Sequence, residues 1–305
     1  MTVLRFLVIL AILLVLLVTV AVIAGGCYYA NALKEDALSV HHGPDELDMR
    51  VVAVGDGRVT LEPAGADEDD DWTQAGVFGL EWEGGYGQVG AILEISHEKV
   101  VREFVTLDGM VEAGTLARLD SFAFAGDPLS AFGLAYRDVV YTSPIGEFPA
   151  WLIPGDAKVW AIFVHGKGAD RQEALRLLPV VADLGLPALV ITYRNDDNVP
   201  QDGSYGYGET ERQDLHAAVD YALQEGAERV VLVGYSMGGA IVLNFLYQSA
   251  LTDRVSALVL DSPLLDLEAA VDWGTRDRFV PWPVADIGKA IASVRYDIEW
   301  DDLDA

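Results

Sequence analysis

The chain has 305 residues, a hydrophobic fraction of 51% and a formal net charge of −28, which fit a globular protein of one large domain or two ordinary ones. The negative charge argues against nucleic acid and anionic lipid surfaces as partners, because both are bound by clustered lysine and arginine. Cys27 is the single cysteine, so the chain forms neither an intramolecular disulfide nor a cysteine-based metal site. We expect no metal and no other cofactor, since the histidines show no ligand spacing (His41, His42, His97, His165 and His216).

An uncharged apolar stretch, Phe6 to Ala24, lies near the N-terminus. As a helix it would span about 28 Å, close to the thickness of the hydrocarbon core of a bilayer, and it is longer than the apolar segment of a cleaved signal peptide. We therefore expect residues 3–24 to form a retained transmembrane helix, within an anchor of residues 1–26. Arg5 precedes the helix and an acidic domain follows it. The positive-inside rule then predicts a single-pass protein with a cytoplasmic N-terminus and the remainder outside the cytoplasm.

The segment Ala24-Gly25-Gly26-Cys27 offers an alternative. It resembles a bacterial lipoprotein cleavage box, after which Cys27 would be lipidated. Such a box usually has a larger aliphatic residue at the position of Ala24, so the sequence favours the retained helix.

Residues 27–48 lack sustained periodicity and are expected to form a linker. From residue 49 short β-like runs follow one another, and Gly55-Asp56-Gly57 between the first two is a hairpin signal. The runs are Arg50–Val54, Arg58–Glu62, Val77–Trp82, Gln88–Ile95, Lys99–Leu107 and Leu116–Phe122. They predict a small β-rich domain, residues 49–135. Its acidic run, 67–71, lacks the spacing of a calcium loop and is expected to be solvated.

The aromatic residues of this β-rich region have two interpretations. They could line a binding face, or they could pack in the core, and strand spacing favours the core. They are Trp72, Phe78, Trp82 and Tyr86.

From Tyr136 onward, strands alternate with helices. After a hairpin (Val139–Thr142 and Phe148–Ile153), we expect the strands Val159–Val164, Ala188–Tyr193, Arg229–Val233 and Val255–Leu260 and the helices Asp170–Leu184, Glu209–Gln224 and Gly238–Gln248. The first helix opens with a D-x-x-E capping box, Asp170 and Glu173. Apolar strands separated by helices predict an α/β fold, a mostly parallel sheet with helices on both faces. Ligands in such sheets bind at the carboxyl ends of the strands. This domain covers residues 136–305 and ends in a cap-like helical region rich in tryptophan (Trp273, Trp282 and Trp300).

The string Gly234-Tyr235-Ser236-Met237-Gly238 lies between a buried strand and a helix. A turn this sharp needs glycine on both sides of the serine, because strand and helix approach closely there. The serine hydroxyl then lies at the top of the sheet and at a helix N-terminus, where negative charge is favoured. A serine that merely caps the helix would not require the two glycines. Ser236 is therefore the candidate nucleophile, in an elbow formed by Gly234 and Gly238.

A second motif, His165-Gly166-Lys167-Gly168, follows another strand. With both motifs the sequence resembles the α/β-hydrolase superfamily, in particular its esterase, lysophospholipase and serine-aminopeptidase-like branch, from about Tyr136 to Leu265. The resemblance implies an oxyanion hole made by the backbone amides of Lys167 and Met237. It also implies that His165 and Gly166 support this loop and that His165 is not the catalytic base.

A serine nucleophile needs a histidine base and an acid that orients it. In this fold the order along the chain is serine, acid, histidine, and no histidine follows Ser236. Asp261 lies at the end of a strand where some members of the family have their acid, but its position before Ser262-Pro263 favours a loop cap. His216 lies inside a predicted helix and is expected to be a surface or core histidine. The triad acid and base are therefore not identifiable.

Two explanations remain open. The sequence is a C-terminally incomplete hydrolase, which the intact elbow and oxyanion loop favour, or it is a membrane-tethered pseudo-hydrolase that binds without catalysis. The first predicts a membrane-anchored serine hydrolase that cleaves ester, amide or thioester bonds through an acyl-enzyme at Ser236. Its substrate would be a small-molecule or lipid-like ester.

Overall fold

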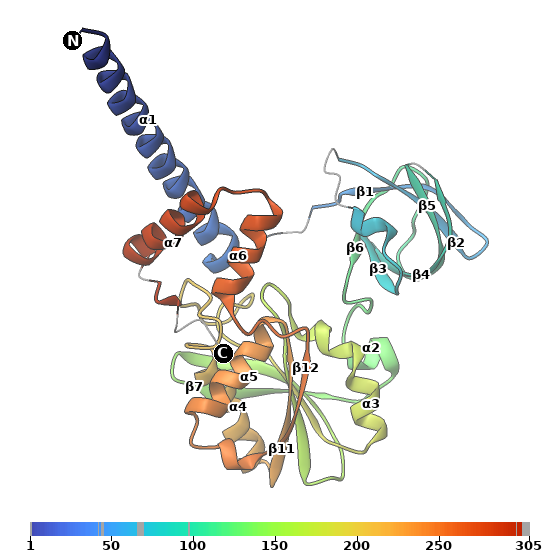
Figure 1. The fold of residues 1–305 in the computed structure, drawn as a ribbon. Coiled ribbons are helices and arrows are strands. Elements are labelled where there is room, and N and C mark those ends of the chain that lie inside the picture. Colours follow the sequence, from blue (N-terminus) through green and yellow to red (C-terminus); the bar gives the residue numbers. More distant parts are fainter. Residues whose placement is uncertain are drawn as a thin grey trace.

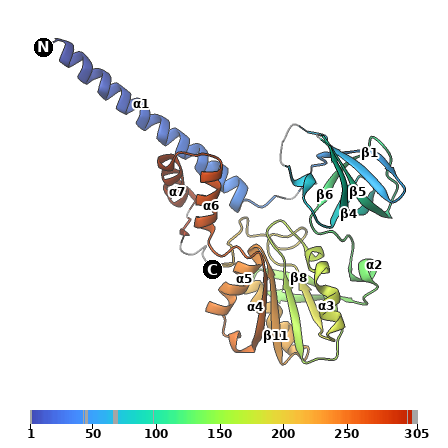
Figure 2. The ribbon, with the colours of Figure 1, turned by 45° about the vertical axis from the view of Figure 1, so that its right-hand side comes forward.

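The computed structural model describes residues 2–41, 43, 46–65, 70–96, 98–296 and 298–300. In it a long N-terminal helix extends away from two β-structured parts, a small barrel and a larger open sheet (Figures 1 and 2). Two helices near the C-terminus lie between the long helix and the open sheet. His42, His97 and most of the acidic run 67–71 lie outside the described residues.

The barrel consists of six antiparallel strands that close on themselves in the order β1-β2-β5-β4-β3-β6. Their bounds are β1 (Met49–Gly55), β2 (Arg58–Pro63), β3 (Phe78–Trp82), β4 (Gly85–Ser96), β5 (Lys99–Asp108) and β6 (Leu116–Asp120), and a short 3-10 turn, η2 (Asp70–Thr73), lies between β2 and β3. Alternate residues point inward, so Val59 and Leu61 of β2 are fully buried while Arg58 is exposed. Closure leaves no free edge, which a small sheet otherwise exposes to unwanted pairing.

Three of the four aromatic residues in question pack in or against the barrel core. Trp82 is 4% exposed and contacts Phe104 inside the barrel, while Phe78 packs at the margin of the core. Trp72 also packs against this core. Tyr86 differs, because its hydroxyl donates a hydrogen bond to Asp120 at 2.6 Å near the barrel mouth. The core interpretation is therefore confirmed for Trp82.

The open sheet has six strands in the order β12-β11-β9-β10-β8-β7. Their bounds are β7 (Arg137–Ser143), β8 (Gly146–Ile153), β9 (Val159–Val164), β10 (Ala188–Ile191), β11 (Arg229–Tyr235) and β12 (Val255–Asp261). The last four are parallel, and β8 joins β10 in antiparallel register. The chain leaves β9 for β10 on one side and returns to β11 on the other. The order in which strands are added to the sheet thus reverses beside β9. Open α/β sheets bind ligands at such a point.

Helices cover both faces of this sheet. One face packs against α4 (Arg212–Gln224) and α5 (Met237–Gln248), the other against η3 (Arg171–Arg176) and α3 (Leu178–Asp183). Adjacent strand residues alternate between the two cores, as Ile162 and Phe163 do in β9. The remaining short elements are α2 (Pro128–Phe132), between barrel and sheet, and η4 (Thr252–Arg254). The predicted α/β fold is confirmed.

The single helix expected over Asp170–Leu184 is wrong in detail, because it is divided into η3 and α3. Pro179 stands in the first turn of α3, and a proline lacks the N–H and the space that a continuous helix needs there. The expected capping box is also wrong. Asp170 does cap, accepting from the Gln172 amide at 2.7 Å, but the Glu173 carboxylate turns to the Gly166 amide instead.

The long helix α1 (Thr2–Leu33) continues into the π-helical turn η1 (Lys34–Leu38), where a linker was expected. It crosses α7 (Trp282–Tyr296), which follows α6 (Leu267–Asp277). Gly26 and Gly288 allow the contact, since a methyl group at Gly26 would lie 2.6 Å from Ile287 Cγ2. Packing against α7 and the sheet domain buries Ala30, Leu33 and Leu38, which explains why this segment is helical without a periodicity of its own.

Candidate active site

Ser236 occupies the turn between β11 and α5 in a strained conformation, with φ 46° and ψ −116°. Non-glycine residues rarely adopt positive φ, and such strain persists only where the surroundings enforce it. Here the Ser236 amide donates to the Asp261 carbonyl at 3.0 Å, and its own carbonyl accepts from the amides of Gly239 and Leu264, each at 3.0 Å. The turn is therefore fixed by β12 and by the chain that leaves it, and the Ser236 side chain is exposed.

The flanking glycines are required by close backbone approach. A methyl group at Gly238 would lie 2.1 Å from the Val164 carbonyl oxygen, and one at Gly234 would lie 2.7 Å from the Gly238 carbonyl oxygen. Both distances are impossible for real atoms. The absence of side chains at the two glycines therefore lets β9, β11 and α5 meet at the point where the strand order reverses.

The His165–Gly168 loop leaves β9 and lies directly beside this turn. A methyl group at Gly166 would lie 3.1 Å from Ser236 Cβ, so the structure brings the two sequence motifs together. The Gly166 amide donates to Glu173 Oε2 at 2.7 Å. Among the residues that the structure describes, no backbone acceptor is bonded to the amides of Lys167 and Met237.

His165 is 3% exposed and both of its ring nitrogens face acceptors. Nδ1 lies 2.9 Å from the Gly166 carbonyl and Nε2 lies 2.8 Å from Asp196 Oδ2, and the ring stacks on Tyr193 at 4.3 Å between centroids. Burial lowers the pKa of His165, but the charge of Asp196 and these hydrogen bonds outweigh it and raise the pKa above its usual value. Its partners give His165 a supporting position in the loop.

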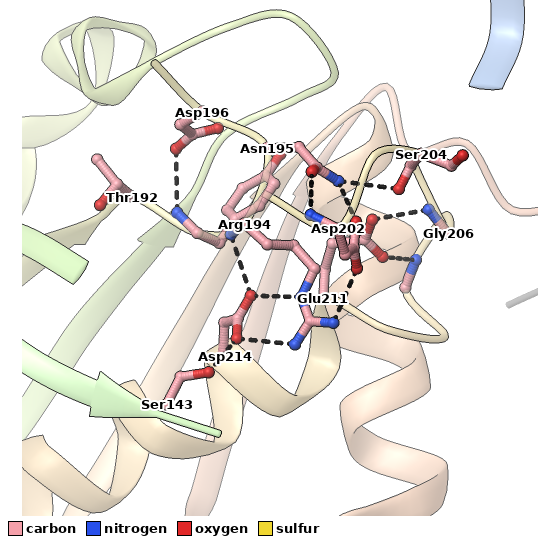
Figure 3. Close-up of polar contacts among 12 residues, drawn as sticks. Ser143, Thr192, Arg194, Asn195, Asp196, Asp202, Ser204, Gly206, Glu211 and Asp214 are labelled. Atoms are coloured by element: carbon pink, nitrogen blue, oxygen red, sulfur yellow. Dashed lines mark hydrogen bonds and ion pairs between the residues drawn. The ribbon is translucent and has the colours of Figure 1, made fainter. Parts of the chain in front are cut away.

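A buried ion-pair network holds the segment that carries Asp196 (Figure 3). Arg194 is 3% exposed. Its guanidinium donates to both carboxylate oxygens of Asp214, at 2.8 and 3.0 Å, and to Asp202 at 3.0 Å. Asp214, fully buried in α4, also accepts from the Arg194 amide and the Ser143 hydroxyl. Burial lowers the pKa of Arg194, but both carboxylates outweigh it and raise that pKa.

Glu211 anchors the following loop from inside. It is fully buried, and its two carboxylate oxygens accept from the amides of Gly206 and Gly208 at 2.7 and 2.9 Å. Burial raises the pKa of Glu211 above its usual range in spite of these bonds. The Arg194–Asp214 pair was not predicted, because its two members lie 20 residues apart along the chain. The Glu211 anchor joins residues only three and five positions apart and was overlooked.

Comparison with known proteins agrees with this topology. A family model described as alpha/beta hydrolase fold matches residues 205–287, which include the Ser236 turn. The chain has an α/β-hydrolase fold. A second family model, described as a domain of unknown function (DUF8805), matches residues 50–120 and thus coincides with the barrel.

Individual relatives cover parts of the chain. The UPF0613 protein PB24D3.06c of Schizosaccharomyces pombe is 31% identical over 154 residues, which are 47% of this chain and 48% of that protein. The chain therefore spans about half the length of this curated relative. Among solved structures, the Pyrococcus furiosus esterase Pf2001 is 20% identical with a TM-score of 0.45, covering 55% of this chain and 66% of its own. An alpha-beta hydrolase from Vibrio vulnificus is 25% identical with a TM-score of 0.42, covering 52% and 55%.

Each histidine that the structure describes is bonded away from Ser236. His165 holds Asp196 and the Gly166 carbonyl. In α4, Nδ1 of His216 lies 2.8 Å from the Ser249 hydroxyl. Nε2 of His41 lies 2.9 Å from the Glu35 carbonyl oxygen. The Asp261 side chain lies 3.5 Å from Arg176 and accepts from the Ser262 hydroxyl at 3.2 Å, and its carbonyl accepts from the Ser236 amide.

A cavity of about 420 Å³ lies between the barrel and the hydrolase sheet. Glu81, Tyr86 and Arg118 line it from the barrel, and Gly168 and Asp170 line it from the chain that follows β9. The barrel thus contributes to a polar cleft beside the Gly166 loop. The sequence indicated Tyr86 as one candidate for a binding face, but it did not indicate that this face meets the hydrolase loop.

Proposed function

We propose that this protein is a serine hydrolase that cleaves ester bonds through an acyl-enzyme at Ser236. The observation that carries the proposal is the strained Ser236 turn, held by glycines and set against the Gly166 loop. Strain of this kind is maintained where a side chain must be presented to a substrate. A helix cap would not need it, and Ser236 makes no capping hydrogen bond.

In the proposed reaction the Ser236 hydroxyl attacks the carbonyl carbon of the ester and loses its proton to a general base. The carbonyl oxygen becomes negatively charged, and the amides of Lys167 and Met237 donate to it as an oxyanion hole. The alcohol leaves with the proton that the base took from Ser236, and water, which gives a proton to the same base, then releases the acid from the acyl-enzyme. The N-terminus of α5, which begins at Met237, adds its positive dipole end to the same place.

A second candidate function rests on the histidines. Since each described histidine is bonded away from Ser236, the alternative is a pseudo-hydrolase that binds an ester in this cleft without turnover. Without a base, the oxyanion hole alone supports only a small part of the catalysis of a full triad.

Labelling with a fluorophosphonate probe tests the proposal on the full chain in detergent micelles, alongside hydrolysis of p-nitrophenyl butyrate. A matched control is Ser262→Ala, because Ser262 is also exposed, also has a positive φ of 48° and follows the neighbouring strand. We expect Ser236→Ala to abolish labelling and turnover and Ser262→Ala to retain both. Equal, negligible labelling of all three forms, with p-nitrophenyl butyrate still bound, would favour the pseudo-hydrolase.

We further propose that α1 anchors the protein in a membrane, with the N-terminus in the cytoplasm and the hydrolase outside it. The segment Val3–Leu38 includes a window with a mean hydropathy of 3.5, and the large apolar side chains from Val3 to Ile23, Val22 excepted, are 48–73% exposed. An exposed apolar surface of this length is stable in hydrocarbon and unstable in water. Retention of the full-length chain in carbonate-washed membranes tests the anchor, and digestion of the hydrolase by external protease in intact cells tests the orientation.

A further inference from the structure

The turn between α6 and α7 exposes two large aromatic side chains. We call residues 276–282 the cap turn. Phe279 is 92% exposed and Trp282 is 76% exposed, although the chain offers apolar cores in which large aromatic residues bury most of their surface. Arg276 and Arg278, on either side of Asp277, are also exposed. Two arginines beside two aromatics contrast with the net charge of −28 of the whole chain.

The backbone holds Phe279 outward at a conformational cost. Helix α6 ends with the Val280 amide donating to the Thr275 carbonyl at 2.8 Å, and the Phe279 φ is 54°. Helices commonly end with such a left-handed residue, and glycine is preferred there because it carries no Cβ. A phenylalanine at this position is both strained and solvated. Neither property helps a domain that stays in water.

The cap turn lies level with the end of the apolar part of α1. Trp282 stands two residues before Val284, and a methyl group at Gly25 would lie 3.2 Å from Val284 Cγ1. Further along, Asn31 Oδ1 accepts from Arg295 at 3.0 Å, so α7 runs away from the apolar stretch as α1 does. The start of α7 therefore lies beside Gly25, directly after Ala24, and its end lies toward the hydrolase (Figure 2).

We propose that the cap turn inserts into the interface of a phospholipid bilayer, with Phe279 and Trp282 among the upper acyl chains and glycerol groups and Arg276 and Arg278 at the phosphates. Aromatic side chains concentrate at this depth, and arginine extends its charged end to the phosphates while its methylenes remain in the apolar layer. The inference rests on the proposed membrane span of α1, which sets the height of the surface. It adds a second contact that holds the cap helices against the lipid.

Site-directed fluorescence tests this on the full chain. Cys27 is the single cysteine, so Cys27→Ser gives a cysteine-free background into which Phe279→Cys is placed and labelled with the environment-sensitive dye NBD. The protein is reconstituted into nanodiscs of phosphatidylcholine and phosphatidylglycerol, with and without lipids that carry a bromine quencher high on the acyl chain. The matched control is Met110→Cys, which is 93% exposed on the barrel.

We expect NBD at residue 279 to shift to the blue and to lose at least half of its emission to the quencher, while NBD at residue 110 stays unquenched. A third probe, Val15→Cys in α1, where Val15 is 64% exposed, separates the two proposals. Quenching at 15 with a 279 signal like that of 110 overturns the cap-turn proposal and leaves the membrane span intact. Absence of quenching at 15 overturns the span and the cap turn with it. Neither result depends on hydrolysis.

Discussion

The barrel and the hydrolase sheet each contain a buried arginine, and the two are satisfied in different ways. Arg102 of the barrel is fully buried, and its hydrogen-bond partners among the residues that the structure describes are carbonyls, those of Trp72, Gly76 and Gly90. Burial lowers its pKa. Arg194 of the sheet domain instead binds two carboxylates. The barrel arginine closes a loop, whereas the sheet arginine fixes the chain segment that supports the Gly166 loop.

Backbone strain also differs between the barrel and the sheet domain. Among the described residues of the barrel, β1–β6, the one non-glycine residue with positive φ is Asp56, in the β1–β2 hairpin turn. In the sheet domain such residues follow strand ends, as Asn195, Ser236 and Ser262 do. Strain that collects at the carboxyl ends of parallel strands marks the place where this fold binds ligands. The comparison separates a part built for closure from a part built to present a site.

The largest effect is expected at Gly238. In Gly238→Ala the new methyl group meets the Val164 carbonyl, which cannot move without displacing β9, so we expect more than about 3 kcal/mol of destabilisation of the sheet domain and loss of fluorophosphonate labelling. Chemical denaturation and probe labelling measure the two outcomes.

The matched control is Gly274→Ala in α6, where the nearest atom to a methyl group is the end of the flexible Arg278 side chain at 3.6 Å. Alanine favours a helix, so this variant is expected to be neutral or stabilised by up to about 1 kcal/mol. If Gly238→Ala behaved like Gly274→Ala, the close approach of α5 to β9 would be wrong.

The two buried arginines give the next largest effect. Arg194→Met leaves Asp214 charged and without its partner in the interior, which costs about 3–5 kcal/mol. Arg102→Met leaves carbonyls unsatisfied but no buried charge, which costs about 1–3 kcal/mol. Hydrogen exchange, read separately for amides of the barrel and of the sheet, measures each loss in its own region. Adding Asp214→Leu to Arg194→Met should recover part of the lost stability. A double variant less stable than either single variant would contradict a direct pair.

Acidity should act on the sheet domain and spare the barrel, with an effect smaller than either arginine variant. Burial raises the pKa of Glu173 and Glu211, and Asp196 raises that of His165 against the effect of burial. A raised pKa means that the folded state holds the proton more tightly than the unfolded state. The stabilisation is thus complete below the unfolded values, about 4.5 for the carboxyls and about 6.5 for histidine, and is lost as the pH rises through the folded values.

We therefore expect the sheet domain to be more stable at pH 5.5 than at pH 7.5, measured by hydrogen exchange corrected for the intrinsic effect of pH. Glu173→Gln keeps an oxygen for the Gly166 amide but removes the titration, so it should reduce the slope. An equal slope in barrel and sheet would contradict the assignment to these groups.

The smallest effect concerns the short helix that joins the two parts. Asp127 caps α2 and accepts from the amides of Leu129 and Ser130 at 2.9 and 2.8 Å. Asp127→Ala should cost about 1 kcal/mol, while Asp127→Asn, which also caps well, should cost less. Differential scanning calorimetry measures both variants. Because α2 lies between barrel and sheet, a loss confined to the barrel transition would assign the helix to the barrel.

The sequence predicted most of the fold because strand periodicity and glycine placement are local signals. β9 was predicted with its observed bounds, and the Ser236 turn was recognised from the two glycines and the strand before them. The helical continuation to Leu38 was missed, since its cause is packing against α7 and the sheet domain. The division of the Asp170–Leu184 helix was readable from Pro179, which was overlooked.

Long-range polar contacts were not readable at all. Arg194 and Asp214 are twenty residues apart and meet only where the chain after β10 reaches the first turn of α4, and the cavity between barrel and sheet depends on how the two parts are placed. The oxyanion-hole amides of Lys167 and Met237 stay predictions.

Residues 26–38 are helical, and this determines whether α1 is joined to the sheet domain rigidly or flexibly. A flexible segment of the same length would let the hydrolase swing in any direction from its anchor point. A helix instead rises about 18 Å in a set direction. Its far end is fastened to the hydrolase, with Lys167 bonded to the Asp36 carbonyl and the Tyr205 amide bonded to the Leu38 carbonyl at 2.9 Å. In a bilayer that holds α1, the connection to the sheet domain is therefore a rigid helix and not a flexible linker. Any tilt of α1 in that bilayer would tilt the mouth of the cleft by the same angle.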